Sequence, residues 1–382
     1  MVSRRGRGSS VEARALANVV FNVSPSSGGE TLWRREAGDF WILQMMKAIR
    51  VITSGTNDQH RPPHELAGGC IGQAWELPER VTALLAGISG VSGVTIEPAT
   101  LANLDCLSEI HDPAYLAFLK ETCLQLKDEA LFPSVFPYRS DPSRRSSRRQ
   151  PGEFCFDTHT PMLAGTFEAA CRMASAAIQA SEAVARDGAI AYALGRPPGH
   201  HAERAKYGGY SYLNNTALAA NALAKLGPVA VLDVDVHHGN GTQHIFYERA
   251  DIRTASIHGD PTQLFPYFSG YAEETGTGAG LGCNRNFPMA AGTRDRDYQP
   301  VLEVALEWLA QARPAFLVVA LGFDTHEADP IGGFRLSTDY FTRMAATIRQ
   351  LNVPTVLVQE GGYALEHLGN CAAAFVRGIR SG

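Results

Sequence analysis

Carboxylate and histidine residues that could bind a metal ion stand at short spacing in this sequence. Asp235 and His237 follow the apolar run 229–234 and lie two positions apart. Two positions are one period of an extended chain, so both side chains point to the same side. Asp324, which follows another apolar run, is a candidate third ligand. Two carboxylates, one imidazole and an open position suit zinc or another divalent ion that polarises a carbonyl group and activates water.

The same residues also have a purely structural interpretation. Asp235 could cap the following helix, and His237 could be a core histidine whose nitrogens are satisfied by neighbours. The metal interpretation is favoured because polar residues follow four separate apolar runs, which an isolated D-x-H segment would not explain. His326, two positions after Asp324, is expected to be a core residue or to support the site indirectly.

Two adjacent histidines form a candidate acid–base pair. His200 and His201 lie in the segment RPPGHH, which follows the apolar run 189–194. Imidazoles exchange protons near neutral pH, and neighbouring polar groups fix their tautomers. Asp233 and Asn240 are the candidate neighbours. The pair GHH alone is a weak signal, so this assignment depends on the other polar segments.

Tyr363 is a candidate donor of a hydrogen bond to a developing oxyanion. It follows the apolar run 355–359 in the segment EGGY, where two glycines would let a substrate oxygen approach closely. The alternative is a surface tyrosine in a glycine-rich turn.

The apolar runs that precede these residues predict one parallel sheet. They are nearly continuous, as expected for strands buried on both faces, and span 189–194, 229–234, 254–258, 316–321 and 355–359. Helical stretches lie between them, most clearly at 165–186, 215–226, 298–312 and 339–351. The expected fold is a single-domain α/β structure with a doubly wound, mostly parallel sheet. Ligands of such sheets bind beyond the carboxyl ends of the strands, where all the candidates lie.

The chain divides into an N-terminal extension, residues 1–45, and the α/β domain, residues 46–382. The extension shows no alternation of strands and helices and is expected to be poorly ordered, whereas the strand-like segment KAIRVITS begins at Met46. Within the domain, segment 140–150 carries four arginines. It is expected to be a solvated loop, with a contact to substrate at the rim of the site as the alternative.

Composition excludes several classes of function. The 382 residues carry 34 Lys and Arg against 39 Asp and Glu, a net charge of −5 without a long basic block, so no nucleic-acid partner is expected. No apolar stretch approaches the roughly 18 residues of a membrane span, so no membrane association is expected. The seven cysteines form no C-x-x-C pair, which indicates free thiols and a cytoplasmic location.

Six segments together resemble the histone deacetylase family, in order and with appropriate spacing. They are RPPGHH, GGYSYLNN, DVDVHHGNGTQ, SIHGDP, GFDTHEADP and EGGY. Within the family, SIHGDP and GYAEETGTGAG are most similar to bacterial acetylpolyamine amidohydrolases. The resemblance implies an arginase-like fold and a zinc-dependent enzyme that hydrolyses an N-acetylated amine to acetate and free amine.

The resemblance also implies a role for each site residue. One Zn²⁺ per chain would be bound by Asp235, His237 and Asp324, with His200 and His201 as acid–base pair and Tyr363 as oxyanion donor. The carbonyl of Gly209 would accept the scissile amide N–H, and Tyr210 and Phe265 would wall the channel. A structural K⁺ would lie near Asp233, Asp235, His237, Ser256 and Ile257. Residues 54–75 would form a polar loop that narrows the entrance and helps to build a homodimer.

Two positions depart from the amidohydrolase pattern. His159 stands where those enzymes carry a glutamate for the distal ammonium group, so weak discrimination for that charge is expected. Asp157 falls where lysine deacetylases keep a rim aspartate that grips the substrate backbone. A narrow aromatic channel and an acidic protein favour acetylated polyamines or small diamines as substrates. An acetyl-lysine peptide and a broad range of small amides remain the alternatives.

Two rival functions are disfavoured. An arginase-type binuclear hydrolase needs a further carboxylate two residues after His237, where the sequence has Gly239. An idle, ligand-binding homologue would not need the complete set of metal ligands, paired histidines and Tyr363.

Overall fold

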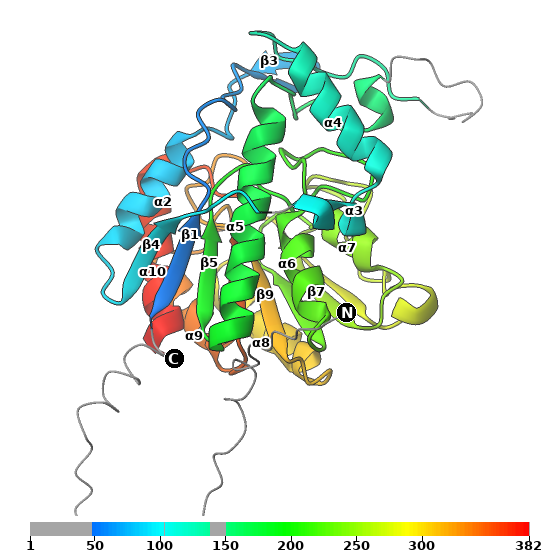
Figure 1. Ribbon diagram of the computed structural model, residues 1–382. Coiled ribbons are helices and arrows are strands. Elements are labelled where there is room, and N and C mark those ends of the chain that lie inside the picture. Colours follow the sequence, from blue (N-terminus) through cyan, green and yellow to red (C-terminus); the bar gives the residue numbers. More distant parts are fainter. Residues whose placement is uncertain (1–47, 103, 138–149, 382) are drawn as a thin grey trace, which may run out of the picture. The chain divides into compact units, whose positions relative to one another are not determined.

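A single eight-stranded parallel sheet forms the centre of the structure. The computed structural model describes residues 48–102, 104–137 and 150–381 (Figure 1). The strand order is β4–β1–β5–β10–β9–β6–β7–β8, and all neighbouring pairs are parallel. The strands are β1 (Ile49–Thr53), β4 (Val94–Pro98), β5 (Ile190–Leu194), β6 (Val229–Asp233), β7 (Ile252–Gly259), β8 (Asn284–Met289), β9 (Phe316–Leu321) and β10 (Thr355–Gln359). The predicted α/β class and parallel sheet are confirmed.

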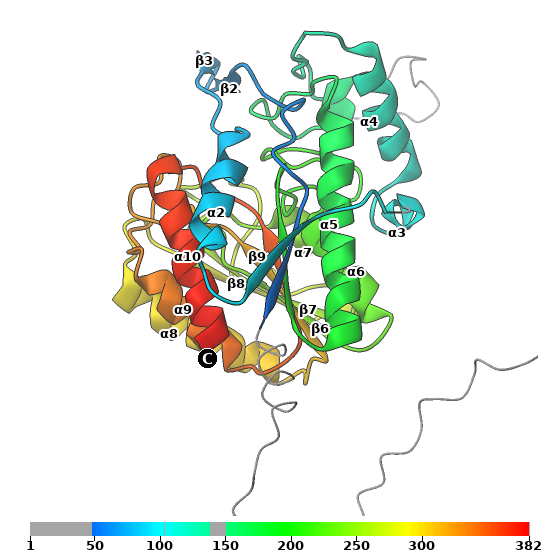
Figure 2. The ribbon, with the colours of Figure 1, turned by 60° about the vertical axis from the view of Figure 1, so that its left-hand side comes forward.

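Helices cover both faces of this sheet (Figure 2). The helices α2 (Glu79–Ser89), α8 (Asp295–Ala310), α9 (Tyr340–Arg349) and α10 (Leu365–Ser381) pack on one face. The helices α4 (Pro113–Gln125), α5 (Thr166–Asp187) and α6 (Asn215–Ala224) belong to the core of the other face. The short helices α3 (Leu107–Ile110) and α7 (Asn240–Phe246) complete the set of α-helices in the described ranges.

The burial of both faces of the sheet explains why the strands can be predicted from the sequence. On β6, Ala230 and Leu232 belong to one core and Val229 and Val231 to the other. Each position from Val229 to Leu232 is therefore apolar, and the run shows no alternation. All five predicted strands and all four predicted helices are present, with ends that differ by a few residues.

The expected polar loop at 54–75 contains a small hairpin. Strands β2 (Glu65–Ala67) and β3 (Cys70–Gly72) pair antiparallel, and Gly68 and Gly69 between them have φ values of +58° and +81°. A two-residue reversal with positive φ at both positions is the geometry that glycine adopts without strain. The hairpin gives this segment a fixed register and thereby fixes which side chains face the site.

Two predictions fall on parts of the chain that the structure does not describe. These are the N-terminal extension, residues 1–45, and nearly all of the arginine-rich segment 140–150. Among the described residues, no helix is both long enough and apolar enough to cross a membrane.

Candidate active site

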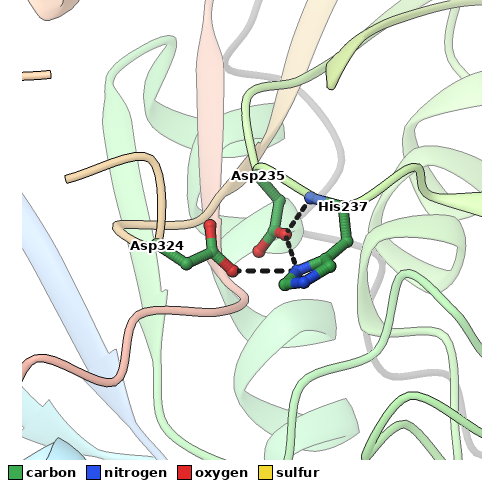
Figure 3. A group of neighbouring side chains, drawn as sticks. All are labelled: Asp235, His237 and Asp324. Carbon is green, nitrogen blue, oxygen red and sulfur yellow. Dashed lines mark hydrogen bonds and ion pairs between the residues drawn. The ribbon is translucent and has the colours of Figure 1, made fainter. Parts of the chain in front are cut away.

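The three predicted metal ligands meet beyond the carboxyl ends of β6 and β9. One ligand atom from each of Asp235, His237 and Asp324 lies within 4.8 Å of the other two, and all three residues are buried (Figure 3). His237 Nδ1 is 3.2 Å from Asp235 Oδ1 and 3.2 Å from Asp324 Oδ2. Two carboxylates and a ring nitrogen that converge on one point form a donor set suited to zinc.

Backbone groups hold the two carboxylates in place. Asp235 accepts N–H groups from His237 at 2.9 Å and Gly361 at 2.8 Å, and Asp324 accepts the Val236 N–H at 2.9 Å. Gly361 must be glycine, because a Cβ atom there would lie 2.0 Å from Asp324 Oδ2. These hydrogen bonds leave the remaining lone pairs of the two carboxylates available to a cation, so the residues present fit a metal ion.

The capping interpretation of Asp235 is wrong. The helix that follows, α7, begins after Gly239 and has no side-chain cap. Asp235 instead accepts the backbone N–H groups of His237 and Gly361, and its carboxylate lies beside the His237 ring. Burial alone would lower the pKa of His237, but the carboxylates of Asp235 and Asp324 raise it to about 10. The cluster thus favours positive charge at the point between its three side chains.

The adjacent histidines have different partners. His200 Nδ1 lies 2.9 Å from Asp233 Oδ2, and His201 Nδ1 lies 2.8 Å from Asn240 Oδ1, as the sequence predicted. Their ring centroids are 4.0 Å apart, and the His201 ring is 6.0 Å from that of His237. The pair is therefore next to the metal-ligand cluster.

Their partners give the two histidines opposite protonation preferences. Burial disfavours the charged form of His200, but Asp233 and Asp235 outweigh it and raise its pKa to about 10. Burial lowers the pKa of His201 well below its usual value, and the charges of His200 and His237 lower it further. Two titratable groups whose pKa values are pushed apart are suited to different roles in proton transfer.

A buried glutamate, which the sequence reasoning missed, fixes the histidine loop. Glu360 accepts the N–H groups of Gly199 at 2.6 Å and His200 at 3.0 Å, together with the Thr216 hydroxyl at 2.7 Å. Burial raises the pKa of Glu360 to about 7. Glu360 is the first residue of the segment EGGY, so its closeness to the candidate Tyr363 is the sequence feature that could have identified it.

Tyr363 is held by two further residues that the sequence did not reveal. Asp329 accepts the Tyr363 N–H at 2.7 Å, and the Arg80 guanidinium lies 4.6 Å from the centre of the tyrosine ring. Arg80 also donates to the Gly362 carbonyl at 2.7 Å. Burial raises the pKa of Tyr363 well above its usual value, so its hydroxyl keeps the proton that it would donate.

A pocket of about 320 Å³ opens onto His201, His237 and Tyr363. It is lined by Glu65, Ala67, Trp75, Asp157, His159, His201, Gly209, Tyr210, His237, Leu264, Phe265, Tyr267, Ile331 and Tyr363. Phe265 lies edge-on to His201, with ring centroids 5.0 Å apart, and the ring centroids of Tyr210 and Tyr363 are 5.8 Å apart. Gly209 has φ +55°, and a Cβ there would lie 2.2 Å from the His201 ring. All five predicted channel residues line this pocket.

Asp157 lines the pocket, and its carboxylate accepts hydrogen bonds from protein donors. It is 8% exposed and accepts N–H groups from His159, Thr160 and Gly209 and the Thr160 hydroxyl. Its neighbour His159 lies edge-on to Phe265, and His159 Nδ1 is buried without a hydrogen-bond partner.

The remaining predicted residues lie behind the cluster. Asp233 pairs with Ser256 in the register of β6 and β7, and Ile257 follows on β7, so the backbone groups predicted for K⁺ are close together. His326 accepts the Ala328 N–H at 3.2 Å and is 3% exposed, in agreement with its expected core role.

Comparison with known proteins agrees with these observations. The family model described as "Histone deacetylase domain" matches residues 75–379. The chain is 40% identical to acetylpolyamine amidohydrolase 1 of Pseudomonas aeruginosa over 336 residues, which cover 84% of this chain and 97% of that protein. It is 38% identical to the acetylpolyamine amidohydrolase of Mycoplana ramosa over 340 residues, 87% of this chain and 99% of that protein.

A solved structure has the same fold. The crystal structure of an acetylpolyamine aminohydrolase from Burkholderia pseudomallei superposes with a TM-score of 0.82 at 36% sequence identity. The match covers 87% of this chain and 98% of that one.

Proposed function

The chain belongs to the histone deacetylase family, and on that premise we propose that it removes acetyl groups from N-acetylated polyamines or small diamines. It is a hydrolytic deacetylase, because its relatives are amidohydrolases over nearly their whole length. The observation that carries the proposal is that three candidate metal ligands, a histidine pair and Tyr363 lie together at one pocket.

Zinc dependence is general to this family, and one zinc ion per chain would be held here by Asp235, His237 and Asp324. The chemistry that zinc supplies when bound is Lewis-acid polarisation of the amide carbonyl and a lower pKa for water. The three residues are buried, and backbone N–H groups hold the two carboxylates, so the site is organised before metal and substrate arrive.

The histidine pair would carry the protons of the reaction. His201 is kept neutral by burial and is suited to accept a proton from the attacking water. His200 is kept protonated by Asp233 and places a positive charge beside the reacting carbonyl. As the C–N bond breaks, the proton taken by His201 passes to the leaving nitrogen, which gives acetate and free amine.

Tyr363 and Gly209 would orient the acetyl group. The Tyr363 hydroxyl donates a hydrogen bond to the carbonyl oxygen as negative charge develops there. The Gly209 carbonyl accepts the amide N–H of the substrate. Both residues line the pocket, with Phe265 and Tyr210 as aromatic walls.

The pocket supports a slender, small substrate. Its lining includes five aromatic side chains, which suit a flexible alkyl chain: Trp75, Tyr210, Phe265, Tyr267 and Tyr363. The carboxylate of Asp157 is occupied by four protein donors, which leaves it poorly suited to grip a peptide backbone. Names of the amidohydrolase relatives point to the same substrate class.

Three further features belong to the proposal. A K⁺ ion would bind backbone carbonyls around Asp233 and Ser256, which pair on adjacent strands. A homodimer would cover the exposed Ile71 on the hairpin, which is 75% exposed, and analytical ultracentrifugation tests this. A cytoplasmic location is supported by the seven cysteines, whose spacing contains no C-x-x-C pair.

A side-by-side rate comparison tests the function. We expect higher kcat/KM for acetylputrescine, acetylcadaverine and acetylspermidine than for an acetyl-lysine peptide. A higher value for the peptide would assign a lysine deacetylase. No hydrolysis of any substrate by zinc-loaded protein would favour the idle, ligand-binding homologue.

A further inference from the structure

We propose that Glu65, on the β2–β3 hairpin, binds the distal ammonium group of the substrate. The inference rests on the proposed function and specifies its substrate class: an acetylated amine that carries a second, positively charged nitrogen. The prediction from sequence was weak charge discrimination, since His159 occupies the position of a glutamate. The structure supplies a negative charge in the same pocket from a different segment.

The hairpin places the Glu65 carboxylate in the pocket wall. Glu65 pairs with Gly72 across the two strands, lines the pocket and is only 5% exposed. Its Oε2 accepts the Tyr210 hydroxyl at 2.8 Å. Since Tyr210 also approaches Tyr363 to 5.8 Å between ring centroids, a single aromatic ring connects Glu65 to the catalytic end of the pocket.

Glu65 is the pocket carboxylate with capacity for a ligand. Among the described residues that line the pocket, only Glu65 and Asp157 have carboxylates. Asp157 already accepts four hydrogen bonds from protein donors. Glu65 receives one side-chain hydrogen bond, from Tyr210, and a backbone contact from Trp75. An ionised carboxylate has about four acceptor positions, so an ammonium group can still be accommodated.

The surroundings of Glu65 suit an alkylammonium ion. Trp75, Tyr210 and Tyr267 line the same pocket, and aromatic faces attract cations. Burial raises the pKa of Glu65, whereas the Tyr210 hydrogen bond and the nearby His159 imidazole lower it. A substrate ammonium would favour the ionised carboxylate, because it places a positive charge beside it.

A matched pair of substrates isolates this contact. N-acetylputrescine and N-pentylacetamide have the same length, but one ends in an ammonium group and the other in a methyl group. For the zinc-loaded wild type we expect kcat/KM at least tenfold higher for N-acetylputrescine, as expected for a charged hydrogen bond. A ratio near one would overturn the inference without any variant.

The variant Glu65→Gln keeps the shape and can still accept the Tyr210 hydrogen bond, but it removes the charge. We expect the ratio of the two kcat/KM values to fall at least tenfold. The control Glu79→Gln removes an exposed carboxylate that pairs with Arg61 outside the pocket lining, and it should keep the wild-type ratio. An unchanged ratio in Glu65→Gln, or an equal fall in the control, would refute the assignment.

A second variant separates charge from geometry. Tyr210→Phe removes the hydrogen bond to Glu65 but leaves its charge, so the ratio should not fall below that of the wild type. A fall as large as that of Glu65→Gln would show that the hydrogen bond, and not the charge, determines specificity.

A binding measurement distinguishes a failure of the Glu65 assignment from a failure of the proposed function. Calorimetric titration of zinc-free protein needs no turnover, and we expect tighter binding of N-acetylputrescine than of N-pentylacetamide, with the difference lost in Glu65→Gln. If neither compound is hydrolysed by zinc-loaded protein yet this difference is present, the function is wrong and the ammonium site is right. Equal binding of both compounds by the wild type refutes the site.

Discussion

At the scale of single residues, hydrogen-bond partners give different properties to identical side chains. His200 faces the carboxylate of Asp233, whereas His201 faces the amide of Asn240. The carboxylate raises the pKa of His200, and burial without a charged partner lowers that of His201. The assignment of His201 as base therefore depends on the neutral character of Asn240.

Asn240→Asp tests this dependence through the pH profile. A carboxylate 2.8 Å from His201 Nδ1 should raise the pKa of His201, because opposite charge favours the protonated ring. A base is lost when pH falls through its pKa, so the acid limb of kcat/KM should move to higher pH. Glu203 accepts the Asn240 amide, so melting temperature and zinc content are measured alongside. An acid limb that stays in place would exclude His201 as the base.

Tyr363→Phe tests the oxyanion donor. The ring keeps its contact with Arg80 and the backbone keeps its hydrogen bond to Asp329, so the variant should fold and bind zinc. Loss of one oxyanion donor should lower kcat by about 10² to 10³ with little change in KM. Wild-type kcat in a variant with full zinc content would show that another group is the donor.

The sequence predicted the site residues that directly follow apolar runs better than the site residues that come from other parts of the chain. Asp235, His237 and His200 stand in short polar segments directly after apolar runs, so their spacing is visible locally. Glu65 and Arg80 come from a hairpin and a helix far from these segments in the chain. No local pattern distinguishes them from ordinary surface charges, and only the folded chain places Glu65 in the pocket lining and Arg80 against the Tyr363 ring.

At the scale of elements, a buried ion cluster joins α2 and residues 56–60 to the end of β5. Glu76 accepts from Arg80 and Arg196, each at 2.9 Å, and all three side chains are at most 1% exposed. Arg196 also donates to the Asn57 carbonyl at 3.1 Å. The cluster thus fixes the segment that leads into the histidine loop.

Glu76→Gln should destabilise the protein by about 3 to 5 kcal/mol, because it leaves two arginines buried without a charged partner. The control is Glu97→Gln, whose exposed pair with Arg50 should contribute at most about 1 kcal/mol. Urea unfolding of both variants measures the difference. Equal losses of stability in the two variants would contradict the role given to the cluster.

The difference in stability between wild type and Glu76→Gln should depend on pH. Burial alone would raise the pKa of Glu76, but Arg196 and Arg80 lower it to about 2. A folded-state pKa below the unfolded value contributes stability above about pH 4.5, and this contribution is lost as pH falls toward 2. The advantage of wild type over Glu76→Gln should shrink across that window.

Strands differ in how well the sequence predicts them. The five strands predicted from the sequence are β5, β6, β7, β9 and β10, which are almost entirely buried; all but β7 are mainly apolar runs. The edge strands β4 and β8 have the sequences VTIEP and NRNFPM, with polar or exposed positions, and therefore lack that signal. The β2–β3 hairpin is too short for periodicity to show it.

At the scale of the whole molecule, the domain boundary stays a prediction. Strand β1 begins at Ile49 and pairs with β4 and β5 inside the sheet. Deletion of residues 1–45 should therefore leave a folded enzyme with wild-type kcat/KM for N-acetylputrescine. Insoluble or inactive protein after this deletion would show that the extension is needed by the domain.

The most direct test of the central claim is a zinc titration of chelator-stripped protein, with acetate release from N-acetylputrescine as the readout. We predict that acetate release rises in proportion to added zinc up to one ion per chain and then stays constant. In Asp324→Asn the titration should show little or no rise, because one of three ligands at an open site is weakened. Full activity in zinc-free wild type, or a wild-type titration curve in Asp324→Asn, would contradict a zinc-dependent deacetylase at this site.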